Sequence, residues 1–383
     1  MPVIGIVAGE SSGDLLGSHL IRALKKRRPD LEFVGIAGPK MIAEGAKSLF
    51  PMERLSVRGY VEVIRHLPGL LNIRKKVLQH FLQNPPDLFI GIDAPDFNFN
   101  LEYKLKRKGI RTIHYASPSI WAWRKGRMEK IKRAVSHMLA LFPFEPALYE
   151  QAGVPVTYVG HPLADILPLE PDRDAARRQL KLLPEHLIIT MLPGSRQSEV
   201  RQLADLYVKT AKLIVQEKPD VQFLVPLITR ETREIFEQAI YENQTNAEAL
   251  THALPIQILI GHAHVAMEAA DAVIVASGTA TLEAALLKRP MVITYRMPAL
   301  SWQILKRMSY LPYVGLPNIL AGRFVVPELL QHNATPKKLA ETVLNLINDK
   351  DLLRDIDTEF TRIHKTLRLN TEEKIAETIL AYL

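Results

Sequence analysis

Short apolar runs rich in β-branched residues alternate with longer amphipathic segments along almost the whole chain. Such runs are typical of strands buried on both faces, and the segments between them are typical of helices that cover a parallel sheet. The alternation occurs twice, and a proline-rich stretch at residues 160–172 separates the two series. The pattern therefore predicts an α/β fold with two Rossmann-like domains, each built on a parallel sheet.

The predicted strands set the domain boundaries. In the first series they are residues 3–8, 32–37, 88–93, 112–116, 137–141 and 156–159. In the second they are residues 187–192, 222–227, 256–259, 272–276 and 291–295. The end of the chain shows a helical pattern without strands. We predict an N-terminal domain over residues 1–165, a C-terminal domain over residues 166–345 and a helical tail over residues 346–383.

Composition excludes several classes of protein. The 383 residues include no cysteine, which rules out a disulfide framework, a thiolate nucleophile and cysteine-ligated zinc. No run approaches the roughly 18 apolar residues of a spanning helix, and the first residues lack the basic start of a signal peptide. We therefore expect a cytoplasmic protein. The net charge of +8 divides into +9 over residues 1–165 and −1 over the rest, which favours an anionic surface or substrate for the first part.

Ligands bind at the carboxyl ends of the strands in such sheets, so the residues that follow strands are the first candidates for a site. After the first predicted strand, the sequence G-E-S-S-G-D, from Gly9 to Asp14, leads directly into a helix. Its glycines permit a close approach of backbone, and the helix N-terminus offers N–H groups to an anion. The glycine spacing differs from that of a dinucleotide site, so we expect no nicotinamide cofactor. An ordinary strand-to-helix turn is the alternative.

Two carboxylates, Asp93 and Asp96, follow another buried strand. A carboxylate beside apolar neighbours can act as a general base. Asp93 lies nearer the strand and is the better candidate. The alternative for Asp96 is a cap of the helix that begins near Asn98.

Two junctions in the second series suit phosphate. The sequence L-P-G-S-R at Leu192 and the sequence A-S-G-T-A-T-L-E at Ala276 both follow strands and precede helices. Backbone N–H groups, small hydroxyls and an arginine in these places can bind a diphosphate, and a glutamate one turn into the helix can accept hydrogen bonds from a ribose. A purely structural role is the alternative for each. The candidate nucleotide contacts are Gly194, Ser195, Arg196, Ser277, Gly278, Thr279 and Glu283.

The histidines do not predict a metal site. His262 and His264 are better explained as solvated residues near a helix start than as ligands. His19 lies on the first predicted helix, where packing or solvation is the simpler interpretation. It becomes a secondary acid or base candidate if it faces the substrate.

The segment from Leu49 to Lys76 interleaves apolar and basic side chains. This pattern suits a helix that lies on an anionic bilayer with its apolar side inward. The alternative is an ordinary amphipathic helix whose apolar face packs on the core. The apolar residues of interest are Val61, Val63, Ile64, Leu67, Leu70 and Leu71.

Taken in order, the motifs resemble those of the lipid-A-disaccharide synthase family, whose members are inverting glycosyltransferases of Gram-negative bacteria with two Rossmann-like domains (the GT-B fold). The resemblance covers nearly the whole chain. Beyond the stretches quoted above, it includes G-I-D-A-P-D-F-N at Gly91, S-P-S-I-W-A-W-R at Ser117, L-F-P-F-E at Leu141, G-H-P at Gly160 and L-P-N-I-L at Leu316.

The resemblance implies a reaction. UDP-2,3-diacylglucosamine and 2,3-diacylglucosamine 1-phosphate (lipid X) would give lipid A disaccharide 1-phosphate and UDP, without a metal or other cofactor. It implies Asp93 as the base, with Asp96 and Glu10 as alternatives, and places Asn318 near the nucleotide. Further substrate contacts would come from Ser12, Gly13, His19 and Trp121.

The resemblance also bears on location and assembly. Both substrates carry acyl chains, so the apolar and basic segment is expected to dock on the anionic inner membrane as part of a peripheral cytoplasmic protein. The family's C-terminal helix tends to return to the first domain. The sequence leaves the oligomeric state open, a homodimer included.

Two other functions remain as alternatives. A UDP-sugar epimerase would share the fold and the nucleotide site but would need no lipid-facing surface. A basic nucleic-acid-binding protein would use its positive charge on phosphates. We expect no nucleic-acid partner, because the sequence lacks an RNA-binding aromatic strand pattern and a zinc module.

Overall fold

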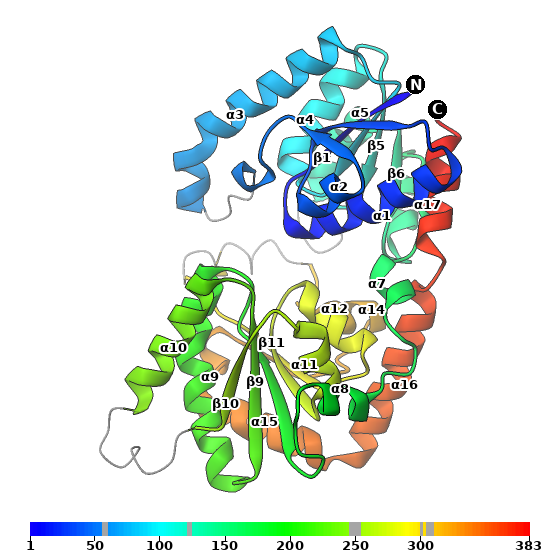
Figure 1. Ribbon diagram of the computed structural model, residues 1–383. Helices are drawn as coiled ribbons and strands as arrows, with labels where there is room; N and C mark the ends of the chain where they lie inside the picture. Colours follow the sequence, from blue (N-terminus) through cyan, green and yellow to red (C-terminus); the bar gives the residue numbers. More distant parts are fainter. Residues whose placement is uncertain (56–59, 121–124, 245–253, 299–301, 304–309) are drawn as a thin grey trace. The chain divides into compact units, whose positions relative to one another are not determined.

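The computed structural model describes residues 1–55, 60–120, 125–244, 254–298, 302–303 and 310–383. The chain folds into two compact units (Figure 1). The first comprises Met1–Asp165 and Thr366–Leu383, and the second comprises Ile166–Lys365. Each unit contains one parallel sheet with helices on both faces, which confirms the predicted α/β class with two Rossmann-like domains.

The first unit is built on seven strands in the order β3-β2-β1-β4-β5-β6-β7. They are β1 (Val3–Ala8), β2 (Glu32–Ile36), β3 (Ala46–Ser48), β4 (Leu88–Ile92), β5 (Arg111–Tyr115), β6 (His137–Ala140) and β7 (Val156–Tyr158). Its helices are α1 (Ser11–Arg27), α2 (Pro39–Ala43), α3 (Tyr60–Gln83), α4 (Pro95–Lys106), α5 (Met128–Ala134), α6 (Glu145–Gln151), α7 (Pro162–Ile166, at the boundary) and α17 (Thr371–Leu380).

The second unit is built on six strands in the order β10-β9-β8-β11-β12-β13. They are β8 (Leu187–Leu192), β9 (Val221–Leu227), β10 (Ile256–Ile260), β11 (Ala272–Ala276), β12 (Met291–Tyr295) and β13 (Glu328–Leu330). Its helices are α8 (Arg173–Gln179), α9 (Gln197–Glu217), α10 (Arg230–Gln244), α11 (Ala263–Ala269), α12 (Thr279–Leu286), α14 (Leu316–Ala321), α15 (Pro336–Asn348) and α16 (Lys350–Leu367).

The sequence pattern did not predict β3 and β13. Both are three-residue edge strands, Ala-Lys-Ser and Glu-Leu-Leu, without β-branched residues, whereas the equally short β7 carries Val156 and Thr157. β3 pairs with β2 and β13 pairs with β12, both in parallel. Their neighbours in the folded sheet therefore define them as strands.

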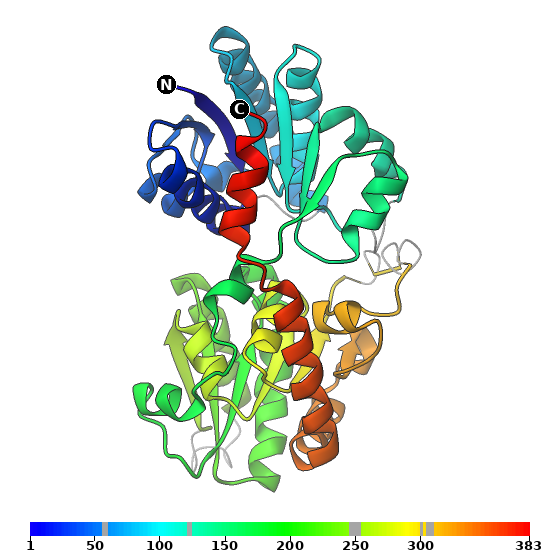
Figure 2. The ribbon, with the colours of Figure 1, turned by 90° about the vertical axis from the view of Figure 1, so that its right-hand side faces the viewer.

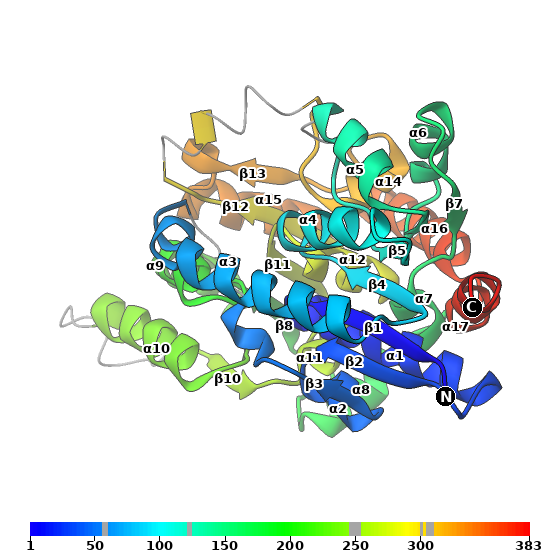
Figure 3. The same ribbon diagram turned by 90° about the horizontal axis from the view of Figure 1, so that it is seen from above.

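The strand order brings together loops that are far apart in the sequence. In the first sheet β1 lies between β2 and β4, with Ala8 opposite Ile92 (Figure 3). In the second sheet β8 and β11 are neighbours, with Leu192 opposite Val275. Because the strands are parallel, the loops that follow β1 and β4 meet at one edge, and so do those that follow β8 and β11.

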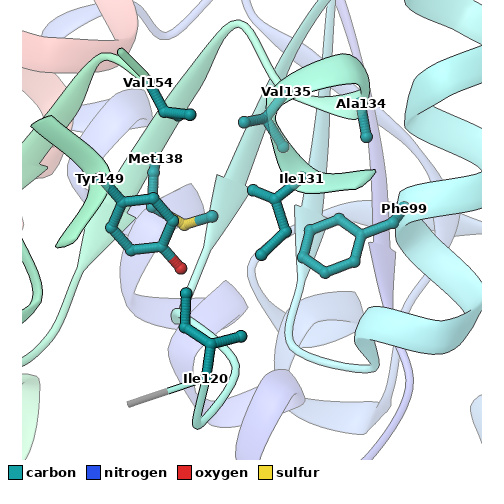
Figure 4. Packing of buried hydrophobic residues seen from close by; sticks show 8 residues of the cluster. All are labelled: Phe99, Ile120, Ile131, Ala134, Val135, Met138, Tyr149 and Val154. Carbon is teal, nitrogen blue, oxygen red and sulfur yellow. The ribbon is translucent and has the colours of Figure 1, made fainter. Parts of the chain in front are cut away.

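A hydrophobic cluster fixes α4, the helix that follows Asp93, against its neighbours (Figure 4). Phe99 of α4 packs with side chains of α5, β6 and α6, among them Ile131, Met138 and Tyr149. The hydroxyl of Tyr149 also lies 2.6 Å from the hydroxyl of Ser117. Close packing on this side leaves α4 little freedom to shift.

The end of the chain returns to the first unit, where α17 (red in Figure 2) packs on α1. Ile375, Ala376 and Ile379 of α17 are buried. Within the described ranges, no helix has both the length and the apolar character needed to cross a membrane.

Candidate active site

Asp93 lies at the carboxyl end of β4 in a tight turn. The backbone φ angles of Asp93 and Ala94 are 50° and 43°, in the left-handed region that L-residues disfavour. The N–H of Asp93 donates to the carbonyl of Tyr115 at 2.9 Å, and the Ser12 hydroxyl donates to the Asp93 carboxylate at 3.3 Å. The half-buried carboxylate is therefore held where it faces the first turn of α1.

The loop after β1 packs closely on this turn. A Cβ built on Gly9 would lie 2.6 Å from the Cβ of Ala94, so only glycine fits there. Gly13 is buried, and a Cβ there would be in ordinary contact with Ala8 at 3.4 Å. Glu10 is partly exposed at the N-cap of α1, beside Ser12. The structure thus brings Glu10, Ser12, Gly13 and Asp93 to one edge of the first sheet.

Asp96 has a different environment from Asp93. Its side chain is 75% exposed and pairs with Arg127 at 2.8 Å. The guanidinium already occupies the Asp96 carboxylate, whereas the Asp93 carboxylate is half-buried and lies beside the first turn of α1. The geometry favours Asp93 for proton transfer.

His19 is buried between α1 and α17. Its Nδ1 lies 3.1 Å from the carboxylate of Glu372, which also accepts from Lys26 at 3.0 Å. Burial raises the pKa of Glu372, but the hydrogen bonds from Lys26 and His19 outweigh burial and hold that pKa below its usual value. His19 therefore lies at the contact that holds α17 on the first unit.

The apolar and basic segment is only partly described, since the structure does not describe the side chains of Val61, Val63 and Ile64. Trp121, a predicted substrate contact elsewhere in the chain, also lies outside the described residues. Further along α3, Leu67 and Leu71 are 43% and 44% exposed, and Leu70 is half-buried. Among the side chains of this helix that the structure describes, Ile73, Val77 and Phe81 are buried.

In the second unit, the junction after β8 already holds an anionic oxygen. The backbone N–H groups of Ser195 and Arg196 donate to the Glu199 carboxylate at 3.1 and 3.4 Å, and the Arg196 guanidinium donates to it at 2.9 Å. Gly194 has a φ of +119°, and a Cβ there would lie 2.6 Å from this carboxylate. The Glu199 oxygens therefore accept from the groups that the sequence analysis predicts to bind phosphate. The sequence analysis did not single out Glu199, although its position three residues after the helix N-cap is that of a capping-box acid.

The junction after β11 is the more open of the two. The Ser277 N–H donates to Thr294, and its hydroxyl donates to the carbonyl of Val314 at 3.1 Å. Gly278 and Thr279 are exposed, and a Cβ on Gly278 would meet no atom within 4 Å. Glu283 of α12 lies 2.8 Å from Nε2 of His264. His264, which the sequence analysis did not favour as a metal ligand, is thus a partner of Glu283, the predicted ribose-binding carboxylate.

Asn318 is fully buried and its amide is used inside the protein. It donates to Val326 and Glu328, both at 2.9 Å, and accepts from Val325 and Val326 at 2.8 and 3.0 Å. These four bonds use the donors and acceptor positions of an amide. Asn318 therefore ties α14 to the segment that follows it, at residues 325–328, with no hydrogen-bonding capacity left over for a ligand.

Glu328, at the start of β13, supports the loop before α14 and was missed by the sequence analysis. It accepts from the N–H groups of Val314 and Gly315 at 3.0 and 2.9 Å. Burial raises its pKa, against the opposing effect of these hydrogen bonds. Since Ser277 donates to Val314, Glu328 also supports the open junction after β11. No local motif marks Glu328, because its partners come from a different segment of the chain.

Two Rossmann-like units with candidate sites at the carboxyl ends of their strands define the GT-B type of fold. Solved structures share it at low sequence identity. The UDP-GlcNAc 2-epimerase of Neisseria meningitidis bound to UDP-GlcNAc aligns with a TM-score of 0.65 and 11% identity over 100% of both chains. A glycosyltransferase of Rickettsia africae aligns with a TM-score of 0.58 and 14% identity over 100% of this chain and 97% of the other. At such identities the likeness shows the fold alone.

Sequence comparison then gives the family: the chain belongs to the lipid-A-disaccharide synthases. The family model described as lipid-A-disaccharide synthetase matches residues 4–379. The lipid-A-disaccharide synthase of Methylobacillus flagellatus is 72% identical over 383 residues, which cover 100% of both chains. That of Azoarcus sp. is 56% identical over 382 residues, or 100% of this chain and 96% of its own. The resemblance seen in the motifs is confirmed, and the chain is a glycosyltransferase of lipid A synthesis. The epimerase and the nucleic-acid-binding protein are set aside.

Proposed function

We propose that the chain transfers 2,3-diacylglucosamine from UDP to the 6-hydroxyl of lipid X and inverts the anomeric configuration. The products are the β-linked disaccharide 1-phosphate and UDP. Membership of the family supports the reaction type. The observation that carries the mechanism is the Asp93 carboxylate, which is half-buried at the end of β4 and held by Ser12.

In this mechanism Asp93 accepts the proton of the acceptor 6-hydroxyl. The hydroxyl oxygen attacks the anomeric carbon from the side opposite UDP, and the bond from that carbon to the UDP oxygen breaks. Ser12 orients the base, and Glu10 and Gly13 lie beside it. Asp96 and Glu10 remain the alternative bases.

We assign nucleotide binding to the second unit. The backbone of Gly194 and Ser195 and the guanidinium of Arg196 bind the diphosphate, which displaces the Glu199 carboxylate from the same groups. Ser277, Gly278 and Thr279 supply the second set of phosphate contacts, and Glu283 accepts from the ribose. Asn318 acts through the loop that supports Ser277. Positive charge and N–H groups here stabilise the departing UDP.

Replacing Arg196 with alanine should weaken UDP binding about 10- to 100-fold, because a charge-assisted contact to the diphosphate is lost. Isothermal titration of the purified variant with UDP measures the effect. The matched control is Arg201→Ala on the helix that follows, where the exposed guanidinium donates to the side-chain oxygen of Gln197 at 3.1 Å. Equal UDP affinity in the Arg196 variant and the wild type would contradict the assignment.

We also propose that α3 docks the first unit on the anionic surface of the inner membrane from the cytoplasmic side. Leu67 and Leu71 are exposed near the start of the part of α3 whose side chains are described. Residues 1–165 carry a net charge of +9. Apolar side chains beside basic groups suit the boundary between headgroups and acyl chains. Val61, Val63, Ile64 and Leu70 belong to the same predicted surface.

The double substitution Leu67→Ser and Leu71→Ser should lower binding to vesicles that contain anionic phospholipid by about tenfold, because two aliphatic side chains that would enter the bilayer are lost. Vesicle co-sedimentation measures the binding. The matched control is Leu82→Ser at the far end of α3, where the leucine is similarly exposed at 41%. If all three proteins sediment alike, α3 does not dock through these leucines.

The proposed reaction is tested directly with purified protein, UDP-2,3-diacylglucosamine and lipid X in detergent micelles. Mass spectrometry should detect the disaccharide 1-phosphate and UDP in equal amounts. UDP binding without any disaccharide would leave the fold and the nucleotide site in place and would refute the proposed acceptor.

A further inference from the structure

A fully buried amide lies directly beneath the turn that carries Asp93. Nδ2 of Asn98, on the first turns of α4, lies 2.8 Å from the carbonyl oxygen of Asp93 and 3.3 Å from those of Ile92 and Val7. These carbonyls stand at the ends of β1 and β4, which are neighbours in the sheet. One side chain therefore ties together the ends of both strands and the backbone of Asp93.

The orientation of this amide follows from its surroundings. Three carbonyl oxygens face one side of it, so the N–H groups must point toward them. Its Oδ1 has no hydrogen-bond partner in the described part of the chain. Asn98 is thus held through its donors alone, which is the property needed to fix carbonyl groups.

The turn that Asn98 holds has a backbone conformation that is unfavourable by itself. Asp93 and Ala94 both have left-handed backbone, which is unfavourable for residues other than glycine. Such a conformation persists only where surrounding contacts determine it. Here the contacts are the Asn98 donors below, the Tyr115 carbonyl on β5 and the close approach of Gly9.

The support beneath Asn98 is rigid. A Cβ on Gly91 would lie 3.0 Å from Cβ of Asn98 and 2.1 Å from Oε1 of Glu102, so both side chains pack on the bare strand. Glu102 and His114 are fully buried and lie 2.7 Å apart. Burial raises the pKa of Glu102, against the opposing effect of His114. Asn98 and this buried pair therefore pack on the same stretch of β4.

We propose that Asn98 is the positioning residue of the general base: its side-chain amide fixes the left-handed Asp93 turn and so aims the carboxylate at the acceptor hydroxyl. The inference rests on the proposed role of Asp93 as the base. Asn98 itself touches no substrate. A shift of about 1 Å in a catalytic group can lower the rate about 100-fold, so a loss of the amide is expected to act on kcat.

The experiment compares Asn98→Ala, Asp93→Asn and the matched control Asn100→Ala in the full-length protein, with kcat, KM for both substrates, UDP affinity and far-ultraviolet circular dichroism. Asn100 lies on the same helix, and its amide donates to the carbonyl of Asp96 near the surface. In Asn98→Ala we expect kcat to fall about 100-fold, with KM and UDP affinity within about threefold of wild type. Asn100→Ala should keep kcat within about twofold.

A near-isosteric variant, Asn98→Asp, gives a second readout if the alanine variant does not fold. The introduced carboxyl faces three carbonyls, with Asp93, Glu102 and His114 nearby. Its neutral form can donate one hydrogen bond to them, whereas its ionised form repels them. Turnover relative to wild type should therefore fall as the pH rises from about 6 to about 9, while circular dichroism reports a folded protein throughout.

The outcomes separate the two proposals. A folded Asn98→Ala variant with kcat within about threefold of wild type, or a flat relative pH profile for Asn98→Asp, overturns the positioning role. If Asp93→Asn itself retains turnover, the assignment of the base fails instead. Loss of kcat in both Asp93→Asn and Asn98→Ala, with Asn100→Ala unaffected, supports both.

Discussion

We expect Asp93→Asn to lower kcat by about 10³-fold while UDP affinity stays within about twofold of wild type, because a positioned general base contributes 10²- to 10⁴-fold. Asparagine has nearly the same shape and can still accept the Ser12 hydroxyl, which lies 3.3 Å from the Asp93 carboxylate. It cannot take a proton from the acceptor hydroxyl. The loss should therefore appear in turnover, measured by product formation, while calorimetric titration with UDP shows an intact second unit.

Asp96→Asn is the matched control and also the test of the alternative base. Asp96 is exposed and paired with Arg127, so its loss removes a surface ion pair of small energetic value. We expect kcat to stay within about threefold of wild type. If Asp96→Asn abolishes turnover and Asp93→Asn does not, the two carboxylates exchange roles.

Arg177→Met should lower the free energy of unfolding of the second unit by about 3–5 kcal/mol, since removing one partner of a buried charged network leaves the others unsatisfied. Arg177 is buried on α8. It donates to the carbonyls of Ala269 and Pro184 at 3.0 and 2.6 Å and to the Asp271 carboxylate at 2.7 Å. Methionine fills the space of the aliphatic stem but supplies none of these donors.

This network reaches the strands that carry the nucleotide junctions. Asp271 also accepts from the N–H of Ile188 at 2.8 Å, so it joins the starts of β11 and β8. Denaturant unfolding followed by circular dichroism measures the loss of stability. Arg178→Met, at the neighbouring exposed position, is the control and should change stability by less than about 0.5 kcal/mol. A loss below about 1 kcal/mol for Arg177→Met would show that water replaces the missing donors at little cost.

Local pattern in the sequence was enough for the fold class, whereas the reaction type came from the resemblance that the motifs carry. Continuous apolar runs, each followed by a turn into a helix, identify the long buried strands, because a strand covered on both faces must be apolar along its whole length. The residues after those strands, among them Asp93, Arg196 and Ser277, were found by the same rule, since parallel strands present their carboxyl ends at one edge. The rule did not identify the short strands β3 and β13, because their three residues include no β-branched side chain.

The tertiary structure decided what each candidate touches. Asp93 and Asp96 are indistinguishable as residue types, and Arg127, distant in the sequence, makes one of them an exposed ion pair. In the sequence Asn98 is an ordinary helix residue. In the fold, the ends of β1 and β4 bring three carbonyl oxygens within reach of its amide. Glu328 and Asn318 likewise find their partners through the fold of the second sheet. Period and composition are local properties of a chain, whereas the partner of a buried polar group depends on which distant segments the sheet order brings beside it.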